Sequence, residues 1–286
     1  MIELRNVSFI YSDDGPFETK ALNDISLKIE DNGFYGLIGH TGSGKTTLVQ
    51  LIAGLVKPSS GEILIDGVNI AEKKFKMRDM PQRIGLVFQY PEYQLFEETV
   101  FDDVAFGPRN MGCDEAEVRR RVTEALQTVG IKEKYYKASP FELSGGQKRR
   151  VAIAGTISTE PPVLILDEPA AGLDPHGRES ILQKITKLQK DRKITVILVS
   201  HSMEDIARTA EKVIVLNKGK LEMLGTTREV FAKGERLSEM GLSIPEISRV
   251  VLGLRERGIN IREDVLTVDE AAEEILKLAA EKGLIK

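Results

Sequence analysis

The stretch of sequence that decides the fold is Gly39-His40-Thr41-Gly42-Ser43-Gly44-Lys45-Thr46. It fits the pattern G-x-x-x-x-G-K-[ST] of a phosphate-binding loop. Residues 33–38, which precede it, form a short continuous apolar run that predicts a strand buried on both faces. Residues 47–52, which follow it, predict the start of a helix. Because the loop lies between a buried strand and a helix, a phosphate-binding role is favoured over a glycine-rich turn without function.

The chemistry of this loop follows from its residue types. Its glycines let backbone N–H groups close around phosphate oxygens, and the following helix adds the positive end of its dipole. Lys45 would place its charge on the β- and γ-phosphates of a nucleotide, and the Thr46 hydroxyl would bind Mg²⁺. We therefore expect the loop, continued by Thr47, to bind the phosphates of a nucleotide. His40 and Ser43 fill variable positions of the pattern, so their side chains are given no role of their own.

Two carboxylates follow a second buried strand. Residues 163–166 are apolar and lead directly into Asp167 and Glu168. Such a strand delivers its terminal side chains to the carboxyl edge of an open α/β sheet, where ligands bind. Asp167 would hold Mg²⁺ through a water molecule opposite Thr46, and Glu168 would act as general base on the attacking water. Taken alone, the segment could be a strand that merely enters an exposed turn.

Buried strands and helices alternate along most of the chain. Apolar runs predict strands at residues 84–88, 163–166, 196–199 and 213–216, and helical stretches lie at residues 115–129, 146–157 and 178–189. This alternation predicts a largely parallel sheet with helices on its faces. Near the amino terminus, residues 7–11 and 25–29 alternate apolar and polar side chains and predict two half-buried strands.

Length, composition and charge exclude several classes of protein. The 286 residues predict about two domains, or one large α/β domain with an appendage. The 40 Lys and Arg against 44 Asp and Glu leave a net charge of −4, which gives no general electrostatic case for nucleic-acid binding. No apolar run approaches the ~20 residues that cross a bilayer, and the first residues lack a signal-peptide pattern, so a membrane role would require a partner. A single cysteine, Cys113, excludes an internal disulfide and suits a cytosolic protein.

The sequence changes character from about residue 226. Pro245 precedes apolar residues at helical spacing, and residues 265–268 resemble a brief strand. Asp269 is expected to cap a last helix. We therefore expect residues 226–286 to form a small α+β domain, which is too short for an independent core and should dock on another surface.

A further candidate phosphate site is the stretch Leu143-Ser144-Gly145-Gly146-Gln147. Ser144 is a good helix N-cap, and the two glycines allow an anion to approach the positive end of that helix closely. An ordinary helix start with two turn glycines is the alternative.

Together, these strings resemble the nucleotide-binding subunits of ABC transporters, over roughly residues 1–225. The resemblance implies an α/β fold of the ABC ATPase type of P-loop NTPase, with a mixed sheet core and an inserted helical subdomain at about residues 90–160. ATP and Mg²⁺ are the implied ligands. In that family the signature of one subunit, here Ser144, Gly145, Gly146 and Gln147, caps the γ-phosphate bound by another subunit. The implied assembly is a head-to-tail dimer with two ATP sites at its interface.

The same resemblance gives roles to four other residues. Tyr11 matches an aromatic residue that stacks on adenine, although a core aromatic residue is the alternative. Gln89 matches the glutamine that touches Mg²⁺ and the attacking water and senses the membrane subunit. Asp174 ends a loop that contacts the partner subunit's site, and His201 matches a histidine that reaches the γ-phosphate. The implied catalytic residues are therefore Glu168, His201 and Gln89, and the implied magnesium ligands are Thr46, Gln89 and Asp167.

Two stretches narrow the resemblance to one branch. Residues 88–97 and 104–110 look like the energy-coupling factor importers of vitamins and metal ions, whose ATPases also carry a short C-terminal dimerisation domain. Tyr90-Pro91-Glu92 looks more like the second of the two paralogous ATPases in these systems. The implied partners are a second ATPase subunit, a transmembrane coupling subunit and a substrate-binding membrane subunit, with this chain peripheral on the cytoplasmic face of the membrane.

An acidic cluster in the same region gives an independent indication. Its members are Glu92, Glu97, Glu98, Asp102 and Asp103, and no basic residue follows until Arg109. We hypothesise that the cluster receives basic helices of a transmembrane subunit. A solvated face that favours a helix dipole is the alternative.

Three other functions compete with this assignment. An ABC-type DNA-maintenance ATPase is disfavoured because the interval from Lys45 to Leu143 cannot hold a long coiled coil. A nucleotide sensor without hydrolysis is disfavoured by the presence of Glu168 and His201. An ATPase subunit of another ABC transporter class stays open, and the sequence does not identify a transported solute.

Overall fold

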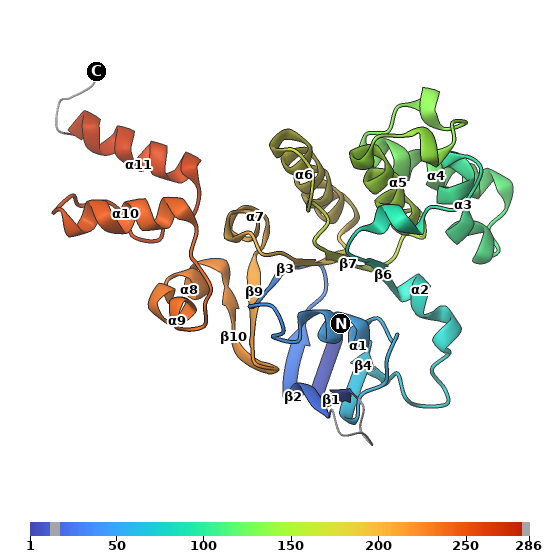
Figure 1. Cartoon of the computed structure of the whole chain (residues 1–286), viewed down its shortest axis with the longest axis horizontal. Helices are drawn as coiled ribbons and strands as arrows, with labels where there is room; N and C mark the ends of the chain where they lie inside the picture. Colours follow the sequence, from blue (N-terminus) through green and yellow to red (C-terminus); the bar gives the residue numbers. More distant parts are fainter. Residues whose placement is uncertain (12–17, 282–286) are drawn as a thin grey trace.

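The computed structural model describes residues 1–11 and 18–281, and its centre is a six-stranded sheet (Figure 1). The strand order is β10-β9-β3-β8-β7-β6. All neighbouring pairs are parallel except β9 and β10, which form an antiparallel hairpin. The strands are β3 (Phe34–Ile38), β6 (Ile84–Val87), β7 (Val163–Asp167), β8 (Thr195–Val199), β9 (Lys212–Asn217) and β10 (Lys220–Thr226). The expectation of a largely parallel, mixed sheet is confirmed.

A second, antiparallel sheet has the order β2-β1-β4-β5. Its strands are β1 (Ile2–Tyr11), β2 (Thr19–Ile29), β4 (Ser60–Ile65) and β5 (Val68–Asn69). The two half-buried strands predicted near the amino terminus are β1 and β2. Their pairing shifts register between Leu4 and Val7, where Asn6 has a φ of 49°. This irregularity interrupts the simple alternation of faces along β1.

Helices follow most strands, and the predicted ones are present. They are α1 (Lys45–Ile52), α2 (Met80–Arg83), α3 (Val100–Asn110), α4 (Glu115–Val129), α5 (Gly145–Ile157), α6 (Pro175–Arg192), α7 (Met203–Thr209), α8 (Thr227–Phe231), α9 (Gly234–Glu239), α10 (Glu246–Glu256) and α11 (Val268–Glu281), with short 3₁₀ helices η1 (Met77–Asp79), η2 (Pro91–Gln94), η3 (Glu133–Tyr135) and η4 (Pro140–Glu142). Helix α6 begins earlier than the predicted residue 178 because Asp174 caps it and Pro175 suits its first position.

The five parallel strands of the six-stranded sheet are buried on both faces, which explains their continuous apolar runs, whereas the edge strand β10 has no buried residue. Along β8, Ile197 and Val199 pack with α1 and the antiparallel sheet, whereas Val196 and Leu198 pack in the core beneath the helices that include α4, α5 and α6. Figure 1 shows these two layers below and above the sheet. The buried strands therefore form a rigid sheet that fixes the positions of the residues at its strand ends.

The C-terminal region corrects one expectation. Residues 265–268 are not a strand, and residues 227–281, all of which the structure describes, contain only helices and loops. Val265 is buried against Val251 of α10, and none of the strands in residues 1–11 and 18–281 pairs with this segment. Helix α11 begins at Val268, one residue before the expected cap, and the Thr267 hydroxyl accepts a hydrogen bond from the Glu270 N–H at 3.3 Å.

Helices α8 and α9 pack into the main core through Val230, Phe231 and Leu237, whereas α10 and α11 share a small core of their own. The Arg228 guanidinium of α8 pairs with Asp264 at 3.1 Å, and the backbone N–H of Glu246 donates to Glu204 Oε1 at 3.1 Å. Figure 1 shows α10 and α11 projecting away from the sheet. Their small shared core leaves Val250, Leu252, Ile275 and Leu276 exposed.

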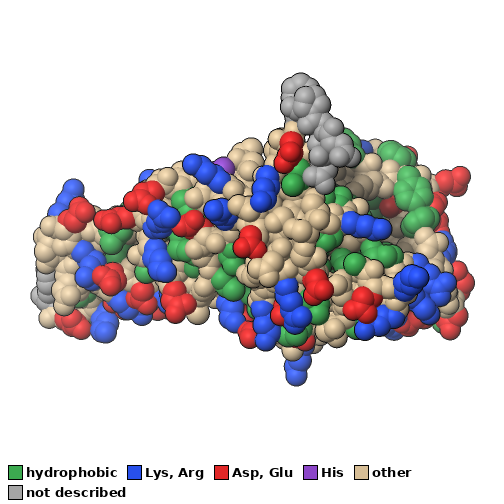
Figure 2. All heavy atoms as spheres, turned by 90° about the horizontal axis from the view of Figure 1, so that it is seen from below, with side chains coloured by type: hydrophobic (Ala, Val, Ile, Leu, Met, Phe, Trp, Pro, Cys, Tyr) green, Lys and Arg blue, Asp and Glu red, His purple; other side chains and the backbone are tan. Residues whose placement is uncertain are grey.

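The surface carries many charges of both signs. Figure 2 shows Lys and Arg side chains interspersed with Asp and Glu on the face seen from below. None of the helices in residues 1–11 and 18–281 combines the length and the apolar character needed to cross a membrane.

Candidate functional site

The predicted site residues follow four neighbouring strands. Strands β3, β8, β7 and β6 are adjacent, parallel and in register, so their carboxyl ends lie at one edge of the sheet. The phosphate-binding loop follows β3, His201 follows β8, Asp167 and Glu168 lie at the end of β7, and Gln89 comes two residues after β6. The fold therefore places the catalytic and loop residues of the sequence prediction at one edge.

The loop between β3 and α1 is closely packed, and glycine is required within it. Gly44 has a φ of 102°, and a Cβ there would lie 2.6 Å from Leu22 Cδ2 and 2.7 Å from the Ala21 carbonyl oxygen. A residue with a side chain would therefore be strained and would clash with β2. The Ser43 hydroxyl is buried without a hydrogen-bond partner in the described chain, and Thr46 is exposed at the start of α1.

Lys45 is held in the loop by backbone oxygens. Its Nζ donates to the carbonyl oxygen of Gly39 at 2.7 Å and to that of His40 at 3.1 Å. Burial lowers the pKa of Lys45, and the negative charges of Glu168 and Asp167 oppose that change. The ammonium group lies among carbonyl and carboxylate oxygens, and its charge is available to an anionic ligand that enters the loop.

Asp167 and Glu168 are two carboxyl groups that have lost much of their hydration. Burial raises the pKa of Asp167, and the charge of Lys45 opposes the change. Burial also raises the pKa of Glu168 to about 7, with Asp167 adding to the rise. Oε1 of Glu168 is buried without a hydrogen-bond partner among the described residues. A carboxylate in this state can accept a proton from bound water near neutral pH.

Glu168 also has an unusual backbone conformation. Its φ is 51°, in the left-handed region, and its N–H donates to the Val199 carbonyl oxygen at 3.1 Å. The turn aims the carboxyl group toward His201, whose Nε2 is 3.7 Å from Glu168 Oε1. Partial burial and the charge of Lys45 lower the pKa of His201, so the imidazole is neutral at pH 7 and can donate or accept a hydrogen bond.

Gln89 and Tyr11 lie on either side of this centre. Gln89 is exposed, directly before Tyr90, which also has a left-handed φ of 57°. Tyr11 is 43% exposed, packs edge-on against Phe9 at 4.8 Å, and its hydroxyl lies 3.2 Å from Thr47 Oγ1 of α1. Tyr11 is thus an exposed aromatic ring beside the phosphate-binding loop rather than a core residue.

The signature residues form a helix start, as predicted, but belong to a different part of the surface. The Ser144 N–H donates to Gln147 Oε1 at 3.0 Å, and the Gln147 N–H donates to Ser144 Oγ at 3.4 Å, which is a capping box. Ser144 and Gly145 are exposed. Within the described residues, no hydrogen bond connects them to the phosphate-binding loop. Asp174 caps α6 by accepting from the Gly177 N–H at 2.6 Å.

The residues proposed to bind Mg²⁺ fit a hard cation that is held together with a phosphate ligand. The Thr46 hydroxyl, the Asp167 carboxylate and the Gln89 amide are oxygen donors, which Mg²⁺ prefers. Among the residues that the structure describes, no three His, Cys, Asp or Glu side chains gather into a metal-binding group. The protein would therefore supply few ligands, and nucleotide phosphates and water would supply the others.

An apolar groove lies beside η2 and α3. Its volume is about 330 Å³, and its lining includes Ile84, Leu95, Phe96 and Phe106. The rings of Phe96 and Phe106 meet edge to face at 5.0 Å, and both side chains are exposed. Exposed aromatic side chains around a groove are typical of a protein-binding site.

The acidic cluster next to this groove is smaller than the sequence suggested. Glu92 pairs with Arg149, Asp102 pairs with Arg109 at 3.0 Å, and Asp103 Oδ2 accepts from two backbone N–H groups. These three carboxylates are engaged within the chain. The partners of Asp102 and Asp103 lie six or seven residues away in sequence, whereas the fold brings the distant Arg149 to Glu92. Of the five acidic residues, Glu97 and Glu98 form no ion pair within the part of the chain that the structure describes.

The Arg149–Glu92 pair is a feature that the sequence analysis missed. Arg149 is 3% exposed and lies between the exposed signature and the core of α5. The helical spacing could have predicted that Arg149 is buried, because Arg149, Ile153 and Ile157 recur every four residues and share a buried face of α5. The left-handed φ of Tyr90 and Glu168 had no sequence signal of its own.

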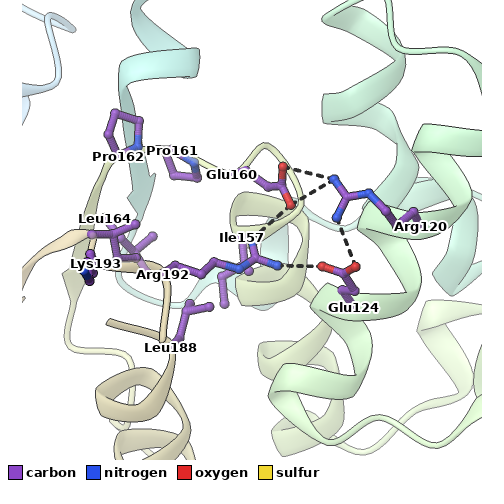
Figure 3. A pocket seen from close by; sticks show the side chains of 11 residues that line it. Arg120, Glu124, Ile157, Glu160, Pro161, Pro162, Leu164, Leu188, Arg192 and Lys193 are labelled. Atoms are coloured by element: carbon purple, nitrogen blue, oxygen red, sulfur yellow. Dashed lines mark hydrogen bonds and ion pairs between the residues drawn. The ribbon is translucent and has the colours of Figure 1, made fainter. Parts of the chain in front are cut away.

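A cavity of about 510 Å³ lies away from this site (Figure 3). It opens at the amino-terminal end of β7, the opposite edge of the sheet. Arg192 of α6 pairs with Glu124 of α4 at 3.0 Å and with Glu160 at 3.3 Å, and Arg120 joins both carboxylates. These side chains satisfy one another, so the cavity marks a junction between helices rather than a catalytic centre.

Comparisons with known proteins agree with this geometry. Residues 22–171 match the protein family described as ABC transporter. The chain is 57% identical over 276 residues to the energy-coupling factor transporter ATP-binding protein EcfA2 of Caldanaerobacter subterraneus subsp. tengcongensis, covering 96% of both chains. It is 44% identical over 286 residues to the protein of the same name from Listeria monocytogenes, covering 99% of both.

Two solved structures are also similar. The first is cbiO1 from Clostridium perfringens, described as part of the ABC transporter complex cbiONQ, with a TM-score of 0.74 and 38% identity over 87% of this chain and 98% of that chain. The second is the ATP-binding cassette MJ0796 in a dimeric post-hydrolysis state with ADP and Pi. Its TM-score is 0.69, with 30% identity over 79% of this chain and 99% of that chain.

Proposed function

Because this chain belongs to the ABC transporter family, we propose that it is the ATP-hydrolysing subunit of an energy-coupling factor importer. The chain is similar over almost its whole length to proteins named EcfA2. This similarity supports its assignment as the second of the two paralogous ATPases. The main observation behind the proposal is that Lys45, Glu168 and His201 lie together at one edge of the sheet. The signature residues Ser144 and Gly145 are exposed at another part of the surface.

ATP binds at the phosphate-binding loop in this proposal. Lys45 exchanges its backbone oxygen partners for β- and γ-phosphate oxygens, and the α1 N-terminus adds its dipole. Thr46, Asp167 and Gln89 hold Mg²⁺, which neutralises charge on the phosphates. The exposed ring of Tyr11 stacks on the adenine, a role that its position beside Thr47 supports.

Hydrolysis depends on the two groups behind the γ-phosphate position. Glu168 takes a proton from the attacking water, since its unpartnered buried oxygen and raised pKa suit a general base. The neutral His201 ring lies beside that carboxylate, and we infer that it contacts the γ-phosphate. Phosphoryl transfer then depends mainly on positioning and charge stabilisation.

Each working site needs a second subunit. Ser144, Gly145, Gly146 and Gln147 form an exposed helix start, and we infer that they cap ATP bound by the neighbouring subunit in a head-to-tail dimer, with Asp174 near the interface. The exposed apolar side chains of α10 and α11 support a second contact between subunits in the region 226–286.

The membrane subunit docks in the groove beside η2. The exposed rings of Phe96 and Phe106 supply apolar area, and Glu97 and Glu98 pair with basic residues of an entering helix. This contact places the chain on the cytoplasmic face of the membrane and couples ATP-driven closure to transport of a vitamin or metal ion. A different ABC transporter class is the alternative, and the membrane partners distinguish the two.

The test is to isolate the complex from its native membrane, identify the co-purifying chains and measure hydrolysis. A second ATPase and membrane subunits should co-purify. Glu168→Gln should still bind ATP, while hydrolysis at this chain's own site falls by about 10²–10⁴-fold and the site completed by this chain's signature keeps hydrolysing ATP. Full hydrolysis at this chain's own site by this variant would refute the general-base role, and full turnover by a dilute monomer would refute the shared site.

A further inference from the structure

We propose that Arg149 is a positioning residue that fixes the orientation of the signature helix. It ties the start of α5 to the segment that follows Gln89, and so sets how Ser144 meets a nucleotide on the neighbouring subunit. This inference rests on the proposed function, because it takes the signature to act on the neighbour's ATP.

The contacts of Arg149 support this role. Its Nε donates to Glu92 Oε2 at 3.0 Å and its Nη2 donates to Glu92 Oε1 at 2.8 Å, which is a bidentate pair. The guanidinium carbon lies 5.6 Å from the centre of the Tyr90 ring. Arg149 is almost fully buried, and the Glu92 side chain is 19% exposed. One side chain of α5 thus holds both η2 and the residue directly after Gln89.

A second loop completes this packing. Arg149 Nη1 lies 3.8 Å from the position that a Cβ would take at Gly172, and a Cβ at Gly146 would lie 3.2 Å from Leu173 Cδ2. The turn that leads to Asp174 therefore packs against the signature on the side of Arg149. The start of α5 is held between η2 and this turn.

Stability alone does not explain a charged pair at this position. A buried ion pair must overcome the loss of hydration of both groups, and apolar side chains of similar volume often stabilise a protein as much or more. A bidentate guanidinium–carboxylate contact, however, fixes direction as well as distance. We infer that this directionality is what the pair contributes, because the signature must meet a phosphate with accurate geometry.

The same pair connects the signature to the groove. Helix η2 ends at Gln94, and Gln94, Leu95 and Phe96 all line the groove. A shift of η2 at the groove acts through Glu92 on Arg149 and hence on the first turn of α5. The groove and the signature then move as one body.

The experiment uses this chain in complex with its second ATPase subunit, in the Glu168→Gln background. This chain's own site is then inactive, and the remaining hydrolysis occurs at the site to which this chain supplies only the signature. The test variant is the double substitution Glu92→Met and Arg149→Met, which leaves no unpaired buried charge. Arg121→Gln is the control, since Arg121 is a partly buried arginine that is also paired with carboxylates, but with Glu117 and Glu160 instead.

We expect the double variant to lower kcat by about tenfold while KM for ATP changes by less than about twofold. Its melting temperature should stay within about 3 °C of the parent protein. The control should leave kcat unchanged. A double variant with the parent kcat, or one in which KM rises as much as kcat falls, would overturn the positioning role.

Ser144→Ala in the same background separates this inference from the proposed function. If Ser144→Ala leaves the remaining hydrolysis intact, the signature does not act on the neighbour's site and the shared-site proposal is wrong. If Ser144→Ala abolishes hydrolysis and the double variant retains it, only the role of Arg149 is wrong.

Discussion

Glu168→Gln should stabilise the nucleotide-free protein, and the gain should depend on pH. The pKa of Glu168 is raised by burial from 4.5 to about 7 in the folded chain. Between these values the unfolded chain ionises the carboxyl group while the folded chain keeps it protonated. The free energy of unfolding therefore falls as pH rises through this window, and above about pH 7 the full loss is present.

The size of the effect follows from the two pKa values. One pKa unit corresponds to about 1.4 kcal/mol, so ionised Glu168 lowers the free energy of unfolding by about 3 kcal/mol at pH 8 and by about 1 kcal/mol at pH 5. Glutamine has nearly the same shape and no charge, so the variant avoids this loss. Its melting temperature should exceed that of the parent by about 5–10 °C at pH 8, and by much less at pH 5.

Calorimetry of the parent and variant without nucleotide tests this reasoning. Glu256→Gln, at an exposed position on α10, is the control and should give the same small change at both pH values. An equal stabilisation by Glu168→Gln at both pH values, or none at pH 8, would show that the carboxyl group is not desolvated in solution.

Two further predictions concern docking and packing. Reversing the charges of Glu97 and Glu98 to Lys should reduce co-purification with the membrane subunits, while the separated ATPase dimer hydrolyses ATP at its usual rate; assembly that survives the reversal would exclude this pair as a docking site. Gly36→Ala should lower the free energy of unfolding by about 1–3 kcal/mol, because a Cβ there would lie 2.8 Å from Ile206 Cγ2. In urea denaturation the control Gly155→Ala, with no atom within 4 Å of its Cβ, should be neutral or stabilising.

Sequence alone located the parts of the site that consist of adjacent residues. The phosphate-binding loop, the pair Asp167 and Glu168, and the cap at Ser144 are each short strings whose chemistry can be read locally. The buried strands were equally clear, because short continuous apolar runs bounded by loops are typical of strands covered on both faces. The roles of Gln89 and His201 could be predicted only from the family resemblance, because the sequence around each residue does not reveal the order of the strands in the sheet.

Features that depend on distant residues were missed or misread. Glu92 and Arg149 are 57 residues apart in sequence, and only the fold shows that they pair. Their pairing also changes the interpretation of the acidic cluster, because a carboxylate held by a buried guanidinium cannot meet an external partner. Residues 265–268 have the composition of a strand, but a strand needs an edge to pair with, and Val265 packs against α10, α11 and the loop at Ile261 instead.

The ion pairs between Arg120, Arg192, Glu124 and Glu160 imply that the junction of α4 and α6 responds unusually to temperature. Hydration of charged groups becomes less favourable on heating, so the free energy needed to dehydrate these side chains falls. Apolar contacts between the same helices gain little over that range. At high temperature this ion-pair network therefore contributes a larger fraction of the free energy that holds α4 and α6 together than it does at low temperature.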